Sequence, residues 1–235
     1  METYKNNFDV LDFNQIINWH QRYEKEQEER LKNGQNFNVF DVLWRSGVGI
    51  GETTHSKLLK FLLDPTETHG CENLFLLEFL KMLNINEPEK GTWKITAEIG
   101  RVDILLKRSF PQSVIVIENK SNWAYNQWNQ LYRYWYQEIF MKTQQTEEAF
   151  YTQNEGFYSI VYLSPTSEKE PTEQTLTRPD NFSASLPKSI PMKVTIKTFY
   201  DDVWQWLEDC KPKILANNQR VIQYINQYQE LCKNL

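Results

Sequence analysis

Cysteine is scarce in this chain of 235 residues. The three cysteines, Cys71, Cys210 and Cys232, lie far apart, and no two form a Cys-x-x-Cys pair. An odd and scattered set argues against a disulfide framework and against a zinc cluster, and it is typical of a reducing compartment. We therefore expect a cytoplasmic protein whose fold does not depend on disulfides.

Long apolar runs are also missing. No run approaches the ~20 residues that a membrane-spanning helix needs, and residues 1–8 lack the basic segment followed by an apolar stretch that marks a signal peptide. We expect neither a membrane-spanning segment nor a signal peptide. The balance of 40% hydrophobic and 24% charged residues is that of a globular protein, long enough for one domain with a substantial core.

An excess of positive charge is missing as well. The formal net charge is -5, which does not favour attraction of the whole surface to nucleic acid. Any contact with DNA would need a local basic patch or the help of a metal ion. The charge balance therefore weighs against a nuclease, although net charge says little about the local field in a cleft.

The spacing of the hydrophobic residues predicts a mixture of helices and strands. Residues 114–117 are apolar on both faces, as expected for a central strand that helices cover on both sides. Five prolines mark residues 164–191 as a long loop. The predicted helices are 9–32, 52–64, 71–83, 123–142, 199–209 and 213–233, and the predicted strands are 93–98, 101–107, 113–119, 157–163 and 192–198.

Three charged residues interrupt two neighbouring strands. Asp103 lies in the first strand, and Glu118 and Lys120 end the second. Ionisable side chains in such hydrophobic runs are costly to bury. Because strand side chains alternate, Glu118 and Lys120 point the same way, and pairing of the two strands would bring Asp103 to them. The pattern predicts one cluster of two carboxylates and an ammonium group.

Such a cluster has the parts of a divalent-metal phosphodiester hydrolase. Carboxylates hold a hard cation, and the cation and the lysine activate water and stabilise phosphoryl charge. A simpler interpretation stays open for each residue. Asp103 could pair with Arg101 or Lys107 at the surface, Glu118 could be a solvated strand end, and Lys120 could form a structural ion pair.

A second group of polar residues lies on the helix predicted at 52–64. Glu52 stands in the first turn, where a carboxylate commonly interacts with the helix dipole. His55 follows one turn later on the same face. Together with His69 they suggest a zinc site, but no second histidine follows at the spacing of the common zinc hydrolases. A structural role for His55 is favoured, and contact with a substrate phosphate stays open.

The helix predicted at 123–142 carries Gln127 and Gln130 about one turn apart. Glutamines on a helix surface are common and need no function. The same segment is rich in tryptophan and tyrosine, which more often form core than a platform for stacked bases. No single aromatic ring stands out as a base-stacking residue.

Taken in order, these motifs resemble the PD-(D/E)XK nuclease superfamily. They are most similar to a branch of bacterial proteins with a Glu-x-x-His-Ser, Leu-Leu-Asp-Pro and His-Gly signature. Val102 stands where the superfamily motif has proline, a position that varies in the superfamily. The resemblance covers about residues 37–235, and its motifs are Glu52-Thr-Thr-His55-Ser56, Leu62-Leu-Asp-Pro65, His69-Gly70, Gly100-Arg-Val-Asp103, Ile117-Glu-Asn-Lys120 and the glutamine segment at 126–134.

The resemblance implies a restriction-endonuclease-like α/β fold with an αβββαβ core. A mixed central sheet would be flanked by helices, with helical additions at both ends. We expect a helical extension over residues 1–36 and a single nuclease-like domain over residues 37–235.

The resemblance also implies a metal-dependent nuclease, with DNA as the substrate. Mg²⁺ or Mn²⁺ would be bound by Asp103, Glu118 and the backbone oxygen of Asn119, and Glu52 would be a third acidic ligand. Lys120 would orient the attacking water. Gln127, or after it Gln130, would lie beside the metal. Cleavage of both strands would favour a homodimer or two sequential nicks, and a partner protein could supply targeting.

Two rival functions remain open from the sequence. A non-catalytic module on the same fold would bind nucleic acid or a partner without turnover, and it would tolerate loss of Asp103 or Lys120. A zinc hydrolase built on Glu52, His55 and His69 would bind zinc even without Glu118. We rank the zinc hydrolase below the binding module.

Overall fold

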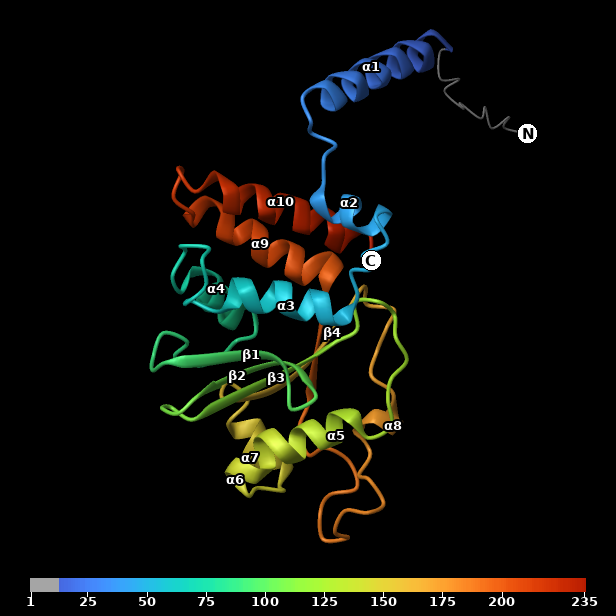
Figure 1. Cartoon of the computed structure of the whole chain (residues 1–235). Coiled ribbons are helices and arrows are strands. Elements are labelled where there is room, and N and C mark those ends of the chain that lie inside the picture. Colours follow the sequence, from blue (N-terminus) through green and yellow to red (C-terminus); the bar gives the residue numbers. More distant parts are fainter. Residues whose placement is uncertain (1–12) are drawn as a thin grey trace, which may run out of the picture.

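The computed structural model describes residues 13–235 (Figure 1). Of the helix predicted at 9–32, residues 9–12 lie outside the described residues, and the rest forms α1 (Phe13–Lys32). Almost every described side chain of α1 is exposed to solvent, and the helix projects away from the body in Figure 1.

The centre of the protein is one mixed sheet of five strands in the order β1-β2-β3-β4-β5. The first three strands are antiparallel neighbours, and β4 and β5 continue the sheet in parallel. The restriction-endonuclease-like α/β fold is thereby confirmed. The strands are β1 (Trp93–Ile99), β2 (Val102–Arg108), β3 (Ser113–Asn119), β4 (Tyr158–Ser164) and β5 (Val194–Thr198).

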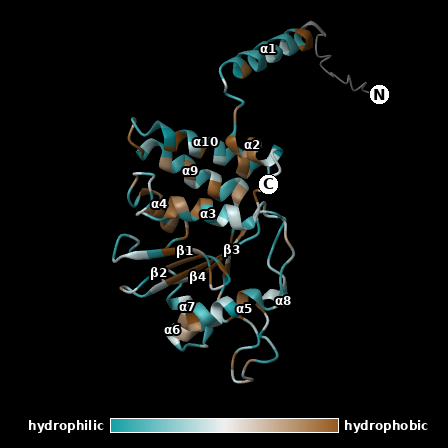
Figure 2. Ribbon diagram, in the orientation of Figure 1, coloured by the Kyte–Doolittle hydropathy of each residue, from teal (hydrophilic) through white to brown (hydrophobic). Residues whose placement is uncertain are grey.

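Both faces of the central strands are buried, as the uninterrupted apolar run predicts. All seven residues of β3 are buried. Ile115 and Ile117 face one hydrophobic cluster, and Val114 and Val116 face the other. Figure 2 shows the strands as a hydrophobic layer between more polar helices. The alternation of side chains therefore places Glu118 on the face of Val114 and Val116.

The first face of the sheet is covered by helices from both ends of the chain (Figure 1). The helix α3 ends before Pro65, as predicted, because the residue before a proline avoids helical geometry. The helix predicted at 71–83 begins only at Leu74, since Glu72 has φ +48°. The covering helices are α3 (Glu52–Leu63), α4 (Leu74–Met82), α9 (Trp204–Cys210) and α10 (Gln219–Lys233), with α2 (Val39–Arg45) against α10.

The second face is covered by the segment that follows β3, and here the predicted helix at 123–142 is wrong in its first part. Helical geometry begins only at Gln130. Trp123 and Asn129 adopt φ of +58° and +57°, a left-handed conformation that interrupts a helix. The helical run consists of α5 (Gln130–Tyr134), a π-helical turn (Trp135–Phe140) and α6 (Met141–Thr143).

The segment predicted as a long loop at 164–191 contains one short helix, α8 (Glu173–Leu176). Another short helix, α7 (Glu148–Gln153), was not predicted. At the C-terminal side, the helix predicted at 199–209 opens with a π-helical turn (Phe199–Val203) before α9, and a 3₁₀ turn (Lys211–Lys213) precedes α10. Within the described residues, no helix has the length and hydrophobicity needed to cross a membrane.

Candidate active site

The strand pairing brings the three charged residues together. β2 and β3 pair with Ile104 opposite Ile117, so the next residues along, Asp103 and Glu118, also lie opposite each other. Lys120 Nζ lies 2.5 Å from Glu118 Oε1. The backbone N–H of Asn119 donates to Asp103 Oδ2 at 2.6 Å. The cluster predicted from the alternation of side chains is therefore present in the structure.

The cluster is buried far more deeply than charged groups usually are. Glu118 is 1% exposed and Lys120 is 2% exposed. Burial, and then repulsion by Glu118, raise the pKa of Asp103 to about 8. Burial also raises the pKa of Glu118, against the attraction of Lys120. One buried and one half-buried carboxylate facing one lysine form a site that is short of positive charge.

Two carboxylate oxygens of this site accept no hydrogen bond. Oε2 of Glu118 and Oε1 of Glu52 are buried without a hydrogen-bond partner, whereas Oε1 of Glu118 pairs with Lys120. Buried polar atoms are almost always satisfied, so orphaned carboxylate oxygens call for a cation. Within residues 13–235 no three His, Cys, Asp or Glu side chains converge closely enough to hold a metal by themselves. The donor set fits Mg²⁺, which binds through one or two carboxylates and keeps several waters.

Glu52 reaches the site from the opposite face of the sheet. The side chain of Asn119 donates to the backbone oxygen of Glu52 at 2.8 Å and to Ser56 Oγ at 3.1 Å. These bonds clamp the start of α3 to the end of β3. Burial raises the pKa of Glu52, while Lys120 lowers it and Glu118 raises it. The carboxylate of Glu52 therefore lies within the field of the cluster.

The two histidines lie elsewhere. His55 is fully buried, with its Nδ1 3.2 Å from the hydroxyl of Tyr228 and its ring against Phe199. Burial lowers the pKa of His55 to about 4. The structure places this side chain in the core, where no substrate phosphate can reach it.

His69 is held by local bonds and is likewise not in the site. Its Nε2 lies 3.1 Å from the backbone oxygen of Asp64, and its Nδ1 accepts from the N–H of Cys71 at 3.0 Å. Both ring nitrogens are thus in use. The structure does not bring His55 and His69 together with Glu52, and the zinc site considered from the sequence is not assembled.

Of the two glutamines, Gln130 contacts the lysine. Its Oε1 accepts from Lys120 Nζ at 3.5 Å, and its Nε2 donates to the hydroxyl of Tyr134 at 2.9 Å. Gln127 is exposed and precedes the helix, so the two residues are not one helical turn apart as predicted. Gln127 does line a cavity with Asp103. The helix start at residue 130 explains the difference.

The cavity that reaches Asp103 has a volume of about 380 Å³. Besides Gln127, Gln130 and Tyr134 it is lined by Arg101 and Arg133. The sequence suggested Arg101 and Lys107 as partners for Asp103. Among the described ion pairs Lys107 instead pairs with Glu138, and Arg101 pairs with no carboxylate. The guanidinium groups therefore make this cavity a positively charged approach to the carboxylates.

A second lysine was missed by the sequence analysis. Burial, and then repulsion by Lys120, lower the pKa of Lys169, while Glu52 opposes that shift. Its Nζ donates to the backbone oxygen of Trp123 at 3.2 Å. Lys169 belongs to the proline-rich segment after β4, about fifty residues further along the chain than Lys120. No local pattern links the two, so nothing in the sequence alone signals this neighbour.

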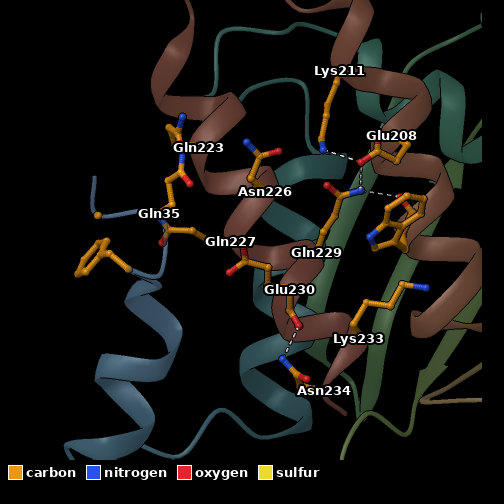
Figure 3. A pocket seen from close by; sticks show the side chains of 13 residues that line it. Gln35, Glu208, Lys211, Gln223, Asn226, Gln227, Gln229, Glu230, Lys233 and Asn234 are labelled. Carbon is orange, nitrogen blue, oxygen red and sulfur yellow. Dashed lines mark hydrogen bonds and ion pairs between the residues drawn. The ribbon is translucent and has the colours of Figure 1, made fainter. Parts of the chain in front are cut away.

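A larger cavity, of about 620 Å³, lies away from these residues, between the linker after α1 and the helices α9 and α10 (Figure 3). Three of its polar side chains bond to one another. Lys211 Nζ lies 2.6 Å from Glu208 Oε1, and Gln229 donates to the same oxygen at 3.0 Å (Figure 3). None of its lining side chains carries an orphaned buried polar atom. We therefore assign the candidate active site to the smaller cavity at Asp103.

A comparison with protein families identifies the chain. The family model described as the PD-(D/E)XK nuclease superfamily matches residues 37–230. The chain belongs to the PD-(D/E)XK nuclease superfamily. No curated protein and no solved structure matches it. Membership of the superfamily suggests metal-dependent nuclease activity on nucleic acid, since PD-(D/E)XK nucleases typically hydrolyse phosphodiester bonds and generally use divalent metals such as Mg²⁺ or Mn²⁺.

Proposed function

We propose that the protein is a Mg²⁺- or Mn²⁺-dependent nuclease that hydrolyses phosphodiester bonds of DNA. The observation that carries the proposal is the half-buried Asp103 beside the buried Glu118, which has an orphaned Oε2 and pairs with a buried lysine. Burying charged groups costs free energy, and groups with strongly perturbed pKa values cluster at functional sites. The positively charged cavity that opens at Asp103 supplies the approach for an anionic backbone.

The metal would be held by the carboxylates of Asp103 and Glu118 and by the backbone oxygen of Asn119. Glu52 would act through a bound water, because the three carboxylates do not converge into one ligand set. A divalent ion in this position polarises the scissile phosphate and lowers the pKa of water. The raised pKa of Asp103 reflects its burial and then the repulsion by Glu118, which a cation would relieve.

Lys120 is the residue we assign to the attacking water. Its Nζ is a triple donor, and Glu118 Oε1 and Gln130 Oε1 hold it in position at 2.5 Å and 3.5 Å. The remaining donor capacity can orient a water or stabilise charge on a phosphate oxygen. Gln130 and Tyr134 position the lysine, and Gln127 lines the approach.

We further propose a cytoplasmic location, from the scattered free cysteines. Cleavage of both strands would use a homodimer or two sequential nicks, and a partner protein could supply targeting. We also propose that residues 37–235 form a single nuclease-like domain, with residues 1–36 as an N-terminal extension. The alternative function, a binding module without turnover, is favoured by one observation, the net charge of -5.

The test is cleavage of plasmid and oligonucleotide DNA with Mg²⁺ or Mn²⁺ by wild type, Asp103→Ala and Lys120→Ala. Matched controls are Asp180→Ala and Lys94→Ala, which change an exposed aspartate and an exposed lysine. Metal-dependent cleavage that both site variants lose and both controls keep is expected. DNA binding without cleavage, unchanged in the site variants, would instead establish the binding module.

A further inference from the structure

We propose that a pocket beside Lys120 binds one unpaired nucleobase, so that the substrate is DNA with a single-stranded segment at the scissile phosphate. We call it the tryptophan pocket. This inference rests on the proposed nuclease function and names its substrate class. The residues of the pocket that carry the argument are Phe40, Trp44, Ile50, Ser121, Asn122 and Trp123.

The shape and chemistry of the pocket suit a flat aromatic ligand. Its volume is about 440 Å³. Phe40 and Ile50 are buried at 4% exposure, whereas Trp44 is 67% exposed and Trp123 is 44% exposed. Exposed tryptophan rings around an apolar floor present stacking surfaces to a ligand that arrives from solvent. Every base has such a face, so the pocket does not require a particular sequence.

Polar groups at the pocket wall match the edge of a base. Ser121 is 1% exposed, and its hydroxyl has no hydrogen-bond partner. Asn122 adds an amide, and Asp41 adds a carboxylate. These groups can pair with the donors and acceptors of a base edge, whereas the carboxylate of Asp41 repels a phosphate. The pocket is therefore a base site, and the phosphate must lie outside it.

The pocket adjoins the candidate active site through two segments of the chain. Ser121, Asn122 and Trp123 directly follow Lys120, and Ile50 lies two residues before Glu52. The two segments touch, because the amide nitrogen of Asn122 lies 3.4 Å from the position a Cβ on Gly51 would occupy. A base in the pocket therefore belongs to a nucleotide whose phosphate is near Lys120 and Glu52.

Lys169 connects the pocket to the site. Its Nζ donates to the backbone oxygen of Trp123 and lies 6.0 Å from the centre of the Trp123 ring. The same ammonium group interacts electrostatically with Lys120 and Glu52. It thus holds the tryptophan wall in place and adds positive charge where the phosphate would lie.

Different segments of the chain line the two cavities. Arg101 and Arg133 line the cavity at Asp103, and the tryptophan pocket adjoins Lys120. A strand can contact the arginines with its backbone and still place a base in the tryptophan pocket. A base in an intact duplex is stacked and paired, so it would have to leave the helix first. Binding to the pocket therefore selects single-stranded DNA.

The test is equilibrium binding, without metal, of a fluorescent single-stranded oligonucleotide and of the matched duplex. Wild type is expected to favour the single strand. Trp44→Ala and Trp123→Ala each lower single-strand affinity by about 5- to 100-fold, the usual effect of removing a stacking ring. Trp123→Phe restores most of the loss, and Trp19→Ala, which removes a 61% exposed ring on α1, changes nothing.

The outcomes separate this inference from the nuclease proposal. Equal affinity of wild type for single strand and duplex, or unchanged single-strand affinity in both tryptophan variants, overturns the base pocket even if DNA is cleaved. Metal-dependent cleavage that fails on every DNA, together with the expected binding losses, overturns the nuclease proposal and leaves the pocket standing. Because both tryptophans are substantially exposed, their truncation leaves the core intact.

Discussion

The buried His55 should make folding stability depend on pH. Its ring is fully buried between Phe199 and Tyr228, and its Nε2 has no hydrogen-bond partner. A protonated imidazolium in this place would lack both water and a counter-ion. Burial therefore lowers the pKa of His55 from its ordinary value of 6.5 to about 4. The variant His55→Gln removes the titration and keeps an oxygen that can accept from the hydroxyl of Tyr228.

The sign and size of the effect follow from these two pKa values. Between pH 6.5 and pH 4 the unfolded chain binds a proton at His55 and the folded chain does not, so the free energy of unfolding falls as the pH is lowered. From pH 7 to pH 5 the loss is about 2 kcal/mol, and its limit at lower pH is about 3 kcal/mol.

The assay is urea unfolding of wild type and His55→Gln at pH 7, pH 6 and pH 5 with a metal chelator. At pH 7 the variant should be less stable by about 1–2 kcal/mol, the cost of an altered buried contact. That difference should shrink by about 2 kcal/mol at pH 5. The control His20→Gln removes a histidine whose side chain is 62% exposed, and it should follow wild type.

The comparison must be between variant and wild type, because Asp103 titrates over the same range with the opposite sign. Its raised pKa lowers stability as the pH rises from 3.8 towards 8. Both proteins share that contribution, so it cancels in the difference. Parallel stability curves for wild type and His55→Gln between pH 7 and pH 5 would refute the account of His55.

Three further perturbations have definite expected outcomes. Asp103→Asn should raise the free energy of unfolding without metal at pH 7 by about 1–3 kcal/mol, after allowance for solvent screening. The same variant should lose the rise in melting temperature that Mg²⁺ causes in wild type. Gln130→Ala should lower kcat by about 10- to 100-fold with little change in KM, because it releases Lys120 from one of its two partners. Steady-state kinetics on a cleavable DNA would measure this. Arg108→Met should cost about 2–5 kcal/mol in urea unfolding, because the buried guanidinium donates to the backbone oxygens of Asn86 and Lys90 at 2.6 Å and 2.9 Å, and each acceptor left unsatisfied costs about 1–3 kcal/mol. Metal affinity, measured by calorimetry, should not change.

The hairpin that carries Asp103, Glu118 and Lys120 could be predicted from the sequence. Its strands are short, apolar and adjacent in the chain, so the period of two determines which side chains share a face. The buried run at 114–117 also indicates that helices cover both faces of β3. Local pattern is sufficient here because the contacts that form this part of the site are themselves local.

The placement of Gln127 and Gln130 shows where local pattern is insufficient. A stretch rich in aromatic residues has the spacing of a helix from residue 123, but the structure starts the helix at Gln130. The backbone N–H of Asn129 donates to Gln174 at 2.9 Å, and the side chain of Asn126 donates to Glu170 at 2.9 Å. These long-range bonds hold the segment in an extended path that propensity does not favour.

The same long-range contacts determine the surroundings of Lys120. The segment after β4 is bonded to residues 123–129, and through that pairing it brings Lys169 to Trp123 and into the field of Lys120. Lys169 contacts Trp123 in the wall of the tryptophan pocket, and its charge also interacts with Lys120 and Glu52. A shift of this segment would therefore alter base binding and phosphate binding together. Lys169→Ala should therefore weaken binding of single-stranded DNA, measured by the same fluorescence assay, and should also lower kcat. A loss of only one of the two would show that the pocket and the site act independently.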